Sequence, residues 1–148
     1  MIDHSNGGFL ISKIKQVQGR VFEKLLIKYG IDQFNGAQGR ILFVLWEKDN
    51  IPISELSIKT GLAKTTLTGM LDRLETSSII ERVFVPNDRR KVNICLTDTA
   101  RNLKNQYDNV SMHMNEIFYK DFSDAEIVDF EKKLTRILSN LTRKEVLK

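Results

Sequence analysis

The stretch ISELSIKTGLAKTTLTGMLDRLE, residues 53–75, contains two short amphipathic segments joined by a glycine-containing turn. The first segment begins at Pro52 or with a cap supplied by Ser54. We expect it to bury Leu56 together with Ile58 or its neighbour. The second segment repeats apolar residues at steps of three and four, the spacing of one helix face: Leu67, Met70, Leu71 and Leu74. Two short helices joined by a tight turn predict a helix-turn-helix.

The opposite face of the second segment carries polar and small residues: Lys64, Thr65, Thr68, Gly69, Asp72 and Arg73. Threonine hydroxyls can bond base edges or phosphates, and lysine and arginine can neutralise phosphates. A glycine inside a helix costs about 1 kcal/mol relative to alanine, but it lets the backbone come close to another molecule. This composition favours a helix that enters a major groove about 12 Å wide. The same pattern also occurs in helix-turn-helices that only pack or bind protein.

Two predicted strands, residues 83–85 and 91–96, follow the helix-turn-helix. The second strand alternates apolar and more polar residues, which is the period of a half-buried strand. The sequence PND at residues 86–88 has the chemistry of a turn. The resulting hairpin carries adjacent cations near its tip: Arg89, Arg90 and Lys91. A helix-turn-helix followed by a hairpin predicts a winged helix, whose helix and hairpin can reach adjacent grooves of one duplex.

Amphipathic helices are predicted on both sides of this segment. The chain has only 2 prolines and 8 glycines among 148 residues, which leaves room for long helices. The first helix is expected over residues 9–29 and ends near Gly30. A second helix begins at a capping box formed by Asn35 and Gln38, and a third runs from a Thr97 cap to about Lys120. The last helix begins at a capping box formed by Ser123 and Glu126. The expected fold class is mainly α with a small β hairpin: a winged helix-turn-helix domain plus N- and C-terminal dimerisation helices.

These features together resemble the MarR family of bacterial transcription regulators, and the resemblance covers nearly the whole chain. Its most specific element is Asp88-x-Arg90, followed by a strand that ends in Leu96-Thr97. The resemblance implies that Asp88 organises the wing and that Arg90 lies near the minor groove of bound DNA. Three positions depart from the family pattern: Ala63, where a capping Ser or Asp is usual, Gly69, where a polar or basic residue is common, and Ser78, where Gly often closes the recognition helix.

The expected organisation is one MarR-like domain over residues 1–148. Its winged helix-turn-helix part covers residues 35–97, and its helical dimerisation part covers residues 1–34 and 98–148. Pairing of the first and last helices across a two-fold axis would set two recognition helices about 34 Å apart, which calls for a near-palindromic operator. The alternative is that these helices bury one another within a monomer.

The resemblance also implies a small effector, often aromatic or phenolic, that binds between the dimer helices and the DNA-binding part. Such a ligand lowers DNA affinity when it favours a dimer geometry that misplaces the two recognition helices. Phe22, Trp46 and Tyr107 are candidate lining residues. Aromatic residues at helical spacing are, however, more often part of the core.

These observations favour a cytoplasmic, DNA-binding transcription regulator that acts as a homodimer on double-stranded DNA. Repression is favoured over activation, because a dimer that covers a promoter blocks polymerase without any further contact. The alternative is a winged-helix protein-interaction module without specific DNA binding. The expected DNA-binding residues are Ser54, Lys64, Thr65, Thr66, Thr68, Gly69, Arg73, Arg89, Arg90 and Lys91.

Other function classes find little support in the sequence. No nucleophile and base at a supporting spacing and no phosphate-binding glycine loop indicate an enzyme, so we expect neither catalysis nor a cofactor. His113 and Glu116 lie one helical turn apart but form too thin a set of ligands for a metal site. Cys95 is the single cysteine, which makes redox sensing a poor interpretation. No apolar run approaches the roughly 20 residues that span a membrane.

Overall fold

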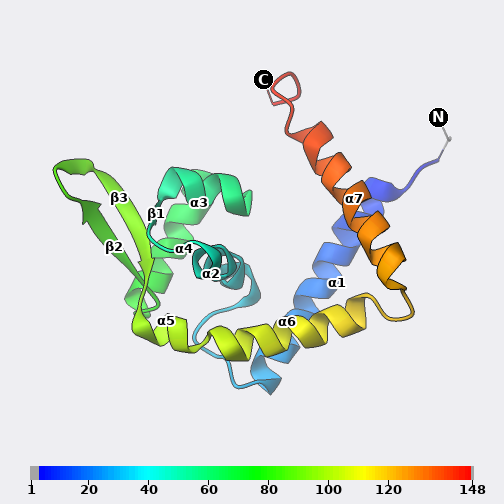
Figure 1. Ribbon diagram of the computed structural model, residues 1–148, viewed down its shortest axis with the longest axis horizontal. Coiled ribbons are helices and arrows are strands. Elements are labelled where there is room, and N and C mark those ends of the chain that lie inside the picture. Colours follow the sequence, from blue (N-terminus) through cyan, green and yellow to red (C-terminus); the bar gives the residue numbers. More distant parts are fainter. Residues whose placement is uncertain (1–3, 148) are drawn as a thin grey trace. The chain divides into compact units, whose positions relative to one another are not determined.

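Figure 1 shows the computed structural model, which describes residues 4–147; the side chain of Arg89 lies outside the described part. The chain forms two compact units that divide between Met114 and Asn115. The elements are α1 (Gly7–Lys28), α2 (Gly36–Glu47), β1 (Ile51–Pro52), α3 (Ile53–Thr60), α4 (Lys64–Thr76), β2 (Ile80–Val85), β3 (Asp88–Leu96), α5 (Asp98–Asn102), α6 (Lys104–Phe118) and α7 (Asp124–Leu141). The first unit holds α1 to α5, the sheet and most of α6, and the second holds the end of α6 and α7.

The sheet has three antiparallel strands in the order β1-β3-β2. β2 and β3 form a hairpin, called the wing from here on, in which Ile80 pairs with Leu96 at the base and Val85 with Asp88 at the tip. The predicted hairpin and the mainly helical fold class are confirmed, although both strands are longer than predicted. β1 was not predicted, because a two-residue strand that ends in Pro52 has no alternation of apolar and polar residues to detect.

The core of the first unit is built around α2. Its residues Ile41, Leu42 and Leu45 have 0% exposed surface, and α1, α3 and β3 all contact this helix. The apolar face predicted for α2 is therefore confirmed, with Trp46 half-buried at its edge. α3 buries Leu56 as expected, but of the alternatives for its second buried position Ile58 was wrong, since this side chain is 83% exposed, and its neighbour Ser57 is half-buried.

The short helix α3 explains the exposure of Ile58. Its buried stripe consists of Leu56 and Thr60, one turn apart, so a residue two positions after Leu56 faces away from the core. The helix begins directly after Pro52, so Ser54 lies in its first turn and does not cap it. It ends at Gly61, whose φ of 73° is a left-handed conformation that glycine adopts without strain.

Both predicted capping boxes are confirmed. The Asn35 side chain accepts the N–H of Gln38 at 2.8 Å, and the Gln38 side chain accepts the N–H of Asn35 at 3.0 Å. Ser123 and Glu126 make the same pair of bonds at the start of α7. Each box satisfies two backbone donors that a helix N-terminus would otherwise leave unpaired.

The helix predicted from Thr97 to about Lys120 is divided. Thr97 caps α5 as predicted, accepting the N–H of Ala100. The carbonyl of Ala100 then accepts from the N–H of Leu103 at 3.2 Å and from Nε1 of Trp46 at 3.1 Å. This tight turn ends α5 before α6 begins, and it attaches both helices to α2 through the indole.

Aromatic rings pack around Tyr107 of α6. The Tyr107 ring centroid lies 4.9 Å from that of Trp46, 5.8 Å from that of Phe22 and 5.9 Å from that of Phe34. Tyr107 also lies over Gly39 of α2, where a Cβ atom would come within 3.0 Å of Tyr107 Cε2. The absence of a side chain at position 39 therefore permits α6 to approach α2.

Two helices carry apolar side chains that the described chain leaves exposed. In the first half of α1, Leu10, Ile14 and Val17 are 52%, 43% and 41% exposed, so the predicted apolar face is buried only towards its end, at Leu25 and Leu26. In the second unit, α7 buries none of its 18 residues. Its exposed apolar side chains include Val128, Ile137, Leu138 and Leu141.

We predict that Gly39→Ala destabilises the protein by about 1 kcal/mol. Helix propensity favours alanine by about 1 kcal/mol, but the new methyl group would press on a tyrosine ring that three other rings hold in place, and overpacking costs about 1–3 kcal/mol. The measurement is urea unfolding followed by circular dichroism. Gly19→Ala in α1 is the control, because a Cβ atom there meets nothing within 4 Å. Equal gains in stability for both variants would contradict the packing argument.

Candidate nucleic-acid interface

Helix α4 separates its apolar and polar faces as predicted. Leu67, Leu71 and Leu74 are at most 1% exposed and face the core. Met70 is half-buried. The outer surface of α4 presents exposed residues of the predicted set: Lys64, Thr65, Thr66, Thr68, Gly69 and Arg73. Ser54 is exposed in the first turn of α3.

The first turn of α4 has no side-chain cap. Its N-cap residue is Ala63, which has no oxygen to accept the backbone N–H groups of that turn. Thr68 turns its Oγ1 back to donate to the carbonyl of Lys64 at 2.8 Å, which leaves the hydroxyl oxygen able to accept. The exposed beginning of α4 thus combines N–H donors, a lysine and hydroxyl groups, all of which suit phosphate oxygens.

Gly69 lies on the exposed face of α4 without any neighbour that requires a glycine. A Cβ atom at this position would meet nothing within 4 Å. Packing inside the chain therefore does not explain a residue that costs a helix about 1 kcal/mol. Close approach of another molecule to the α4 backbone would explain it.

Arg82 of β2 attaches the wing to α4. Its guanidinium lies 2.7 Å from Oδ1 of Asp72 and 2.9 Å from Oε1 of Glu75, and its side chain is 22% exposed. Partial burial opposes the charge of Arg82, but the hydrogen bonds to Asp72 and Glu75 outweigh this effect and raise the pKa of the guanidinium, which stays charged. The two carboxylates beside the outer face of α4 are therefore paired with a cation.

Sequence reasoning did not single out Arg82, and it counted Asp72 simply as part of the polar face. A signal was present: Asp72 and Glu75 are three residues apart, so both lie on one side of α4. Two carboxylates one turn apart on a helix otherwise rich in cations and hydroxyls indicate a partner cation. The sequence alone does not identify which arginine of the hairpin supplies it.

The wing turns at Pro86 and Asn87, the latter with a φ of 70°. Asp88 follows, and its Oδ1 accepts the backbone N–H of Arg90 at 3.0 Å. Arg90 and Lys91 are exposed beside this turn. The tip therefore presents cationic side chains on a backbone that Asp88 helps to hold, while the predicted contact of the Arg89 side chain lies outside the described part.

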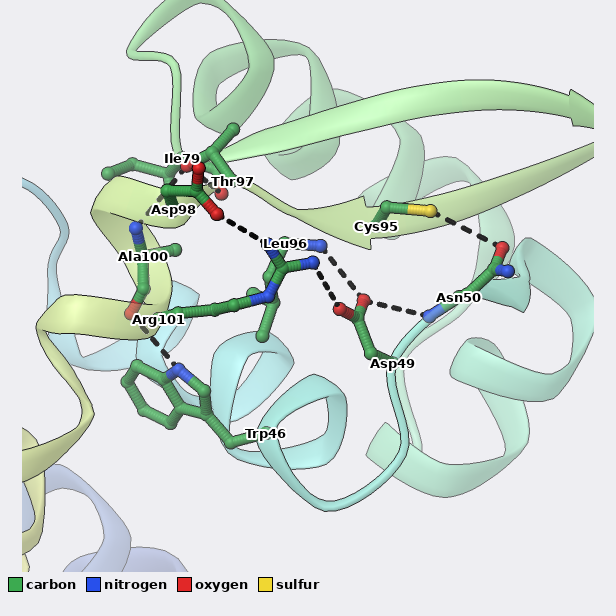
Figure 2. Close-up of polar contacts among 10 residues, drawn as sticks. All are labelled: Trp46, Asp49, Asn50, Ile79, Cys95, Leu96, Thr97, Asp98, Ala100 and Arg101. Atoms are coloured by element: carbon green, nitrogen blue, oxygen red, sulfur yellow. Dashed lines mark hydrogen bonds and ion pairs between the residues drawn. The ribbon is translucent and has the colours of Figure 1, made fainter.

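The base of the wing is held by residues that follow α2 (Figure 2). Asp49 accepts the N–H of Leu96 at 2.9 Å and pairs with Arg101 of α5 at 3.0 Å. The Asn50 side chain accepts from Cys95 Sγ at 3.3 Å (Figure 2). It also accepts from the side chain of Asn93 at 3.0 Å. These contacts join α2, β3 and α5, so the wing is fixed at its base as well as along α4.

Cys95 is therefore a packing and hydrogen-bonding residue of the wing base. Burial raises the pKa of the Cys95 thiol, and the charges of Asp49 and Glu81 act in the same direction. A raised pKa keeps the thiol protonated, and the thiolate is the reactive form. This agrees with the interpretation that the cysteine is no redox sensor.

The described residues 4–147 contain no group of three or more His, Cys, Asp or Glu side chains that could hold a metal ion. The ring of His113 instead meets the hydroxyl of Tyr29, with 3.2 Å between Nδ1 and Oη. Within the same residues, no helix is both long and apolar enough to cross a membrane.

A surface hollow of about 560 Å³ lies beside the aromatic cluster. Of the three aromatic residues considered for an effector site, Phe22 and Tyr107 line this hollow, whereas Trp46 packs against Tyr107 and does not line it. Its charged lining residues are Lys15, Arg20, Glu23 and Arg40. The carboxylate of Glu23 also accepts the N–H of Gly36 at 2.6 Å and so connects α1 to the first turn of α2.

The arrangement of α3, α4 and the wing defines a winged helix-turn-helix protein with a cationic, hydroxyl-rich outer surface. The MarR family pattern matches residues 34–92. The uncharacterized HTH-type transcriptional regulator YsmB of Bacillus subtilis (strain 168) is 32% identical over 136 residues, which cover 90% of this chain and 88% of that protein. The chain therefore belongs to the MarR family of transcription regulators, and the resemblance inferred from the sequence is confirmed.

Two further relatives are informative. The homoprotocatechuate degradative operon repressor of Escherichia coli is 32% identical over 69 residues, which cover 47% of each protein. The crystal structure of a mutant MarR from Escherichia coli, complexed with operator DNA, matches this fold with a TM-score of 0.78. That similarity covers 88% of this chain and 92% of the other, at 26% sequence identity.

We predict that Gly69→Ala raises stability and lowers DNA affinity at the same time. The methyl group meets open space and improves helix propensity, so the free energy of unfolding should rise by about 0.5–1 kcal/mol. If DNA approaches the α4 backbone, the same methyl group obstructs it. Thermal unfolding and fluorescence anisotropy with labelled operator DNA measure the two effects. Gly19→Ala should give the stability gain alone, and an unchanged affinity for Gly69→Ala would show that DNA keeps its distance from this position.

Proposed function

We propose that this protein is a transcriptional repressor that binds a near-palindromic DNA operator as a homodimer. The observation that carries the proposal is the exposed outer face of α4, held by Arg82 beside a wing with a cationic tip. A helix of this width fits a major groove, and a hairpin beside it reaches the neighbouring backbone. The operator complex of the related MarR supports the same mode of use.

The proposed DNA contacts follow from chemistry and exposure. Lys64 and Arg73 meet phosphates, and Thr65, Thr66 and Thr68 reach base edges or phosphates from the exposed face of α4. Gly69 admits the DNA to the helix backbone. Ser54 of α3 and Lys91 of the wing are exposed and add contacts to the DNA phosphates, and Arg90 enters the minor groove beside the Asp88 turn. Arg89 is proposed as a further phosphate contact on its charge alone.

The homodimer is proposed because apolar helix faces need a partner. The exposed apolar side chains of α1 and of α7 each have the periodicity of a buried helix face, and exposed apolar faces mark protein interfaces. We assign residues 1–34 and 98–148 to dimerisation and residues 35–97 to DNA binding. Two-fold pairing gives two recognition helices, and two half-sites make the operator near-palindromic.

Repression is the proposed mode of regulation. A dimer that covers a promoter excludes polymerase by occupying the DNA. Repression of this kind requires no contact between the regulator and polymerase. The related operon repressor from Escherichia coli supports this choice. No enzymatic activity is proposed.

We predict that the protein binds duplex DNA from upstream of its own coding region with an affinity that falls steeply with salt. Arg90→Ala should weaken binding on all sequences and reduce the salt slope by about one unit for each phosphate that Arg90 neutralises. Fluorescence anisotropy between about 50 and 200 mM salt measures the slope. Lys28→Ala, at the exposed end of α1, removes a cation outside the interface and should leave the slope unchanged.

The absence of saturable, salt-sensitive binding by the wild-type protein would exclude the proposed function and favour the protein-interaction alternative. An unchanged slope in a well-folded Arg90→Ala variant would be a narrower result. It would show that Arg90 has a structural role in the wing and does not contact phosphate, and the proposal of DNA binding would be unaffected.

The proposed effector is a small aromatic or phenolic acid that occupies the hollow beside Tyr107. Aromatic rings can stack on Phe22 and Tyr107, and three cations against one carboxylate favour an anionic group. A ligand at this position would press on the contact between Glu23 and Gly36 that connects α1 to α2. Differential binding to a dimer with displaced recognition helices would then lower DNA affinity.

We predict that 4-hydroxybenzoate at millimolar concentration lowers DNA affinity, whereas the uncharged 4-hydroxybenzamide has a weaker effect. Arg40→Gln should raise the concentration needed for release about tenfold, which corresponds to the loss of one charge-assisted hydrogen bond. Titration of the protein–DNA complex with each compound measures this. Lys132→Gln also removes one positive charge, at a residue of the second unit that does not line the hollow, and should respond like the wild type. Equal potency of the acid and the amide would contradict an anionic site.

A further inference from the structure

The wing carries an aromatic side chain that the chain does not bury. Phe84 of β2 is 64% exposed, although its cross-strand partner is the apolar Val92. The third strand, β1, pairs with β3 only at Ile94 and Asn93, so the sheet is two-stranded at the level of Phe84. Figure 1 shows this end of the β2–β3 hairpin projecting away from the helices of the first unit. Nothing within the described chain explains an aromatic residue at this place.

The face of the wing on which Phe84 lies is defined by Arg82. Residues two apart in a strand point to the same side, so Phe84 shares the side from which Arg82 reaches Asp72 and Glu75 of α4. Val83, 41% exposed, points to the opposite side of the wing. Phe84 therefore lies on the α4 side, one step closer to the cationic tip than the ion pair that joins wing and helix.

The charges around Phe84 indicate what covers it. Arg90 is exposed nearer the tip and lies two residues before Val92, the partner of Phe84, so it shares this side of the wing. α4, which Arg82 joins to the same side, presents the exposed cations Lys64 and Arg73 on its outer face. A partner protein could cover an apolar side chain without these cations. A DNA strand presents phosphates at its outer edge and the apolar C–H surfaces of deoxyribose between them, so it suits both the cations and Phe84. Phenylalanine and other apolar side chains do occur at minor-groove interfaces, where they pack against the nucleotides.

We propose that Phe84 packs against the deoxyribose rings of the DNA strand that passes between α4 and the wing. The inference rests on the proposed function, and it adds an apolar contact to an interface otherwise made of charges and hydroxyls. Phosphate contacts release counterions and weaken with salt, whereas burial of an aromatic ring does not. Phe84 therefore supplies a part of the DNA affinity that salt does not remove.

The test compares Phe84→Ala, Phe84→Leu and Val83→Ala by fluorescence anisotropy on DNA from upstream of the coding region, at several salt concentrations. Phe84→Ala should raise the Kd about tenfold for each Phe84 of the dimer that packs against DNA, the effect of losing about half the burial of one aromatic side chain, by the same factor at every salt concentration. Phe84→Leu should retain most of the affinity, because leucine still covers sugar surface. Val83→Ala is the matched control on the other side of the wing and should bind like the wild type. Since Phe84 is 64% exposed, thermal unfolding of its two variants should match the wild type, and the same measurement checks that Val83→Ala, at a residue 41% exposed, is folded.

Three results would overturn the inference: an unchanged Kd for Phe84→Ala, a salt slope altered as in Arg90→Ala, or an equal loss in Val83→Ala. Equal losses in the alanine and leucine variants would also overturn it, because the contact would then not be apolar packing. These results are distinct from failure of the proposed function, in which the wild-type protein itself binds no DNA.

Discussion

Burial of α2 is the constraint on which the DNA-facing part of the molecule depends. Ile41, Leu42 and Leu45 are excluded from solvent, and full burial of one such side chain contributes about 1.5–3 kcal/mol. α1, α3 and β3 pack directly on this helix, while α6 approaches it over Gly39. α2 therefore lies between α1 and α6 on the one hand and, on the other, α3 and β3, which adjoin the elements that carry the proposed DNA contacts. The hollow beside Tyr107 lies at this junction.

Polar contacts then orient what the apolar core holds together. Arg82 joins the wing to α4, and Asp49 and Asn50 join the base of the wing to α2 and α5. Exposed ion pairs contribute little to the free energy of unfolding, usually below about 1 kcal/mol. These contacts instead fix the position of the wing relative to α4, which the proposed DNA recognition requires. Loss of Arg82 would affect recognition more than stability, and it would also leave two carboxylates unpaired beside the DNA.

Local signals in the sequence predicted much of this architecture. Caps at Asn35, Thr97 and Ser123, the glycine stop at Gly61 and the alternation of β3 are all properties of neighbouring residues, and the structure confirms them. The failures involve tertiary contacts. β1 exists only because β3 pairs with it, and α5 ends where Trp46, over fifty residues earlier, shares the carbonyl of Ala100. The exposure of candidate DNA-binding residues followed from periodicity, but Arg82 and Phe84 become informative only when α4 lies beside the wing.

The ion pairs of Arg82 also determine which cations of the proposed interface are available to DNA. The described chain has no ion pair for Lys64, Arg73, Arg90 or Lys91, whereas Arg82 is occupied by Asp72 and Glu75. If each of those four cations meets one phosphate, a dimer makes about eight such contacts, and log K falls with log salt concentration with a slope near −7. Affinity of this kind is strong at low salt but shared by all DNA sequences. In the proposed interface the threonines of α4 would discriminate among sequences, and the apolar contact of Phe84 would maintain binding where salt screens the charges. Charged, hydroxyl and apolar residues of one small surface would then contribute separately to attraction, sequence selection and retention of DNA.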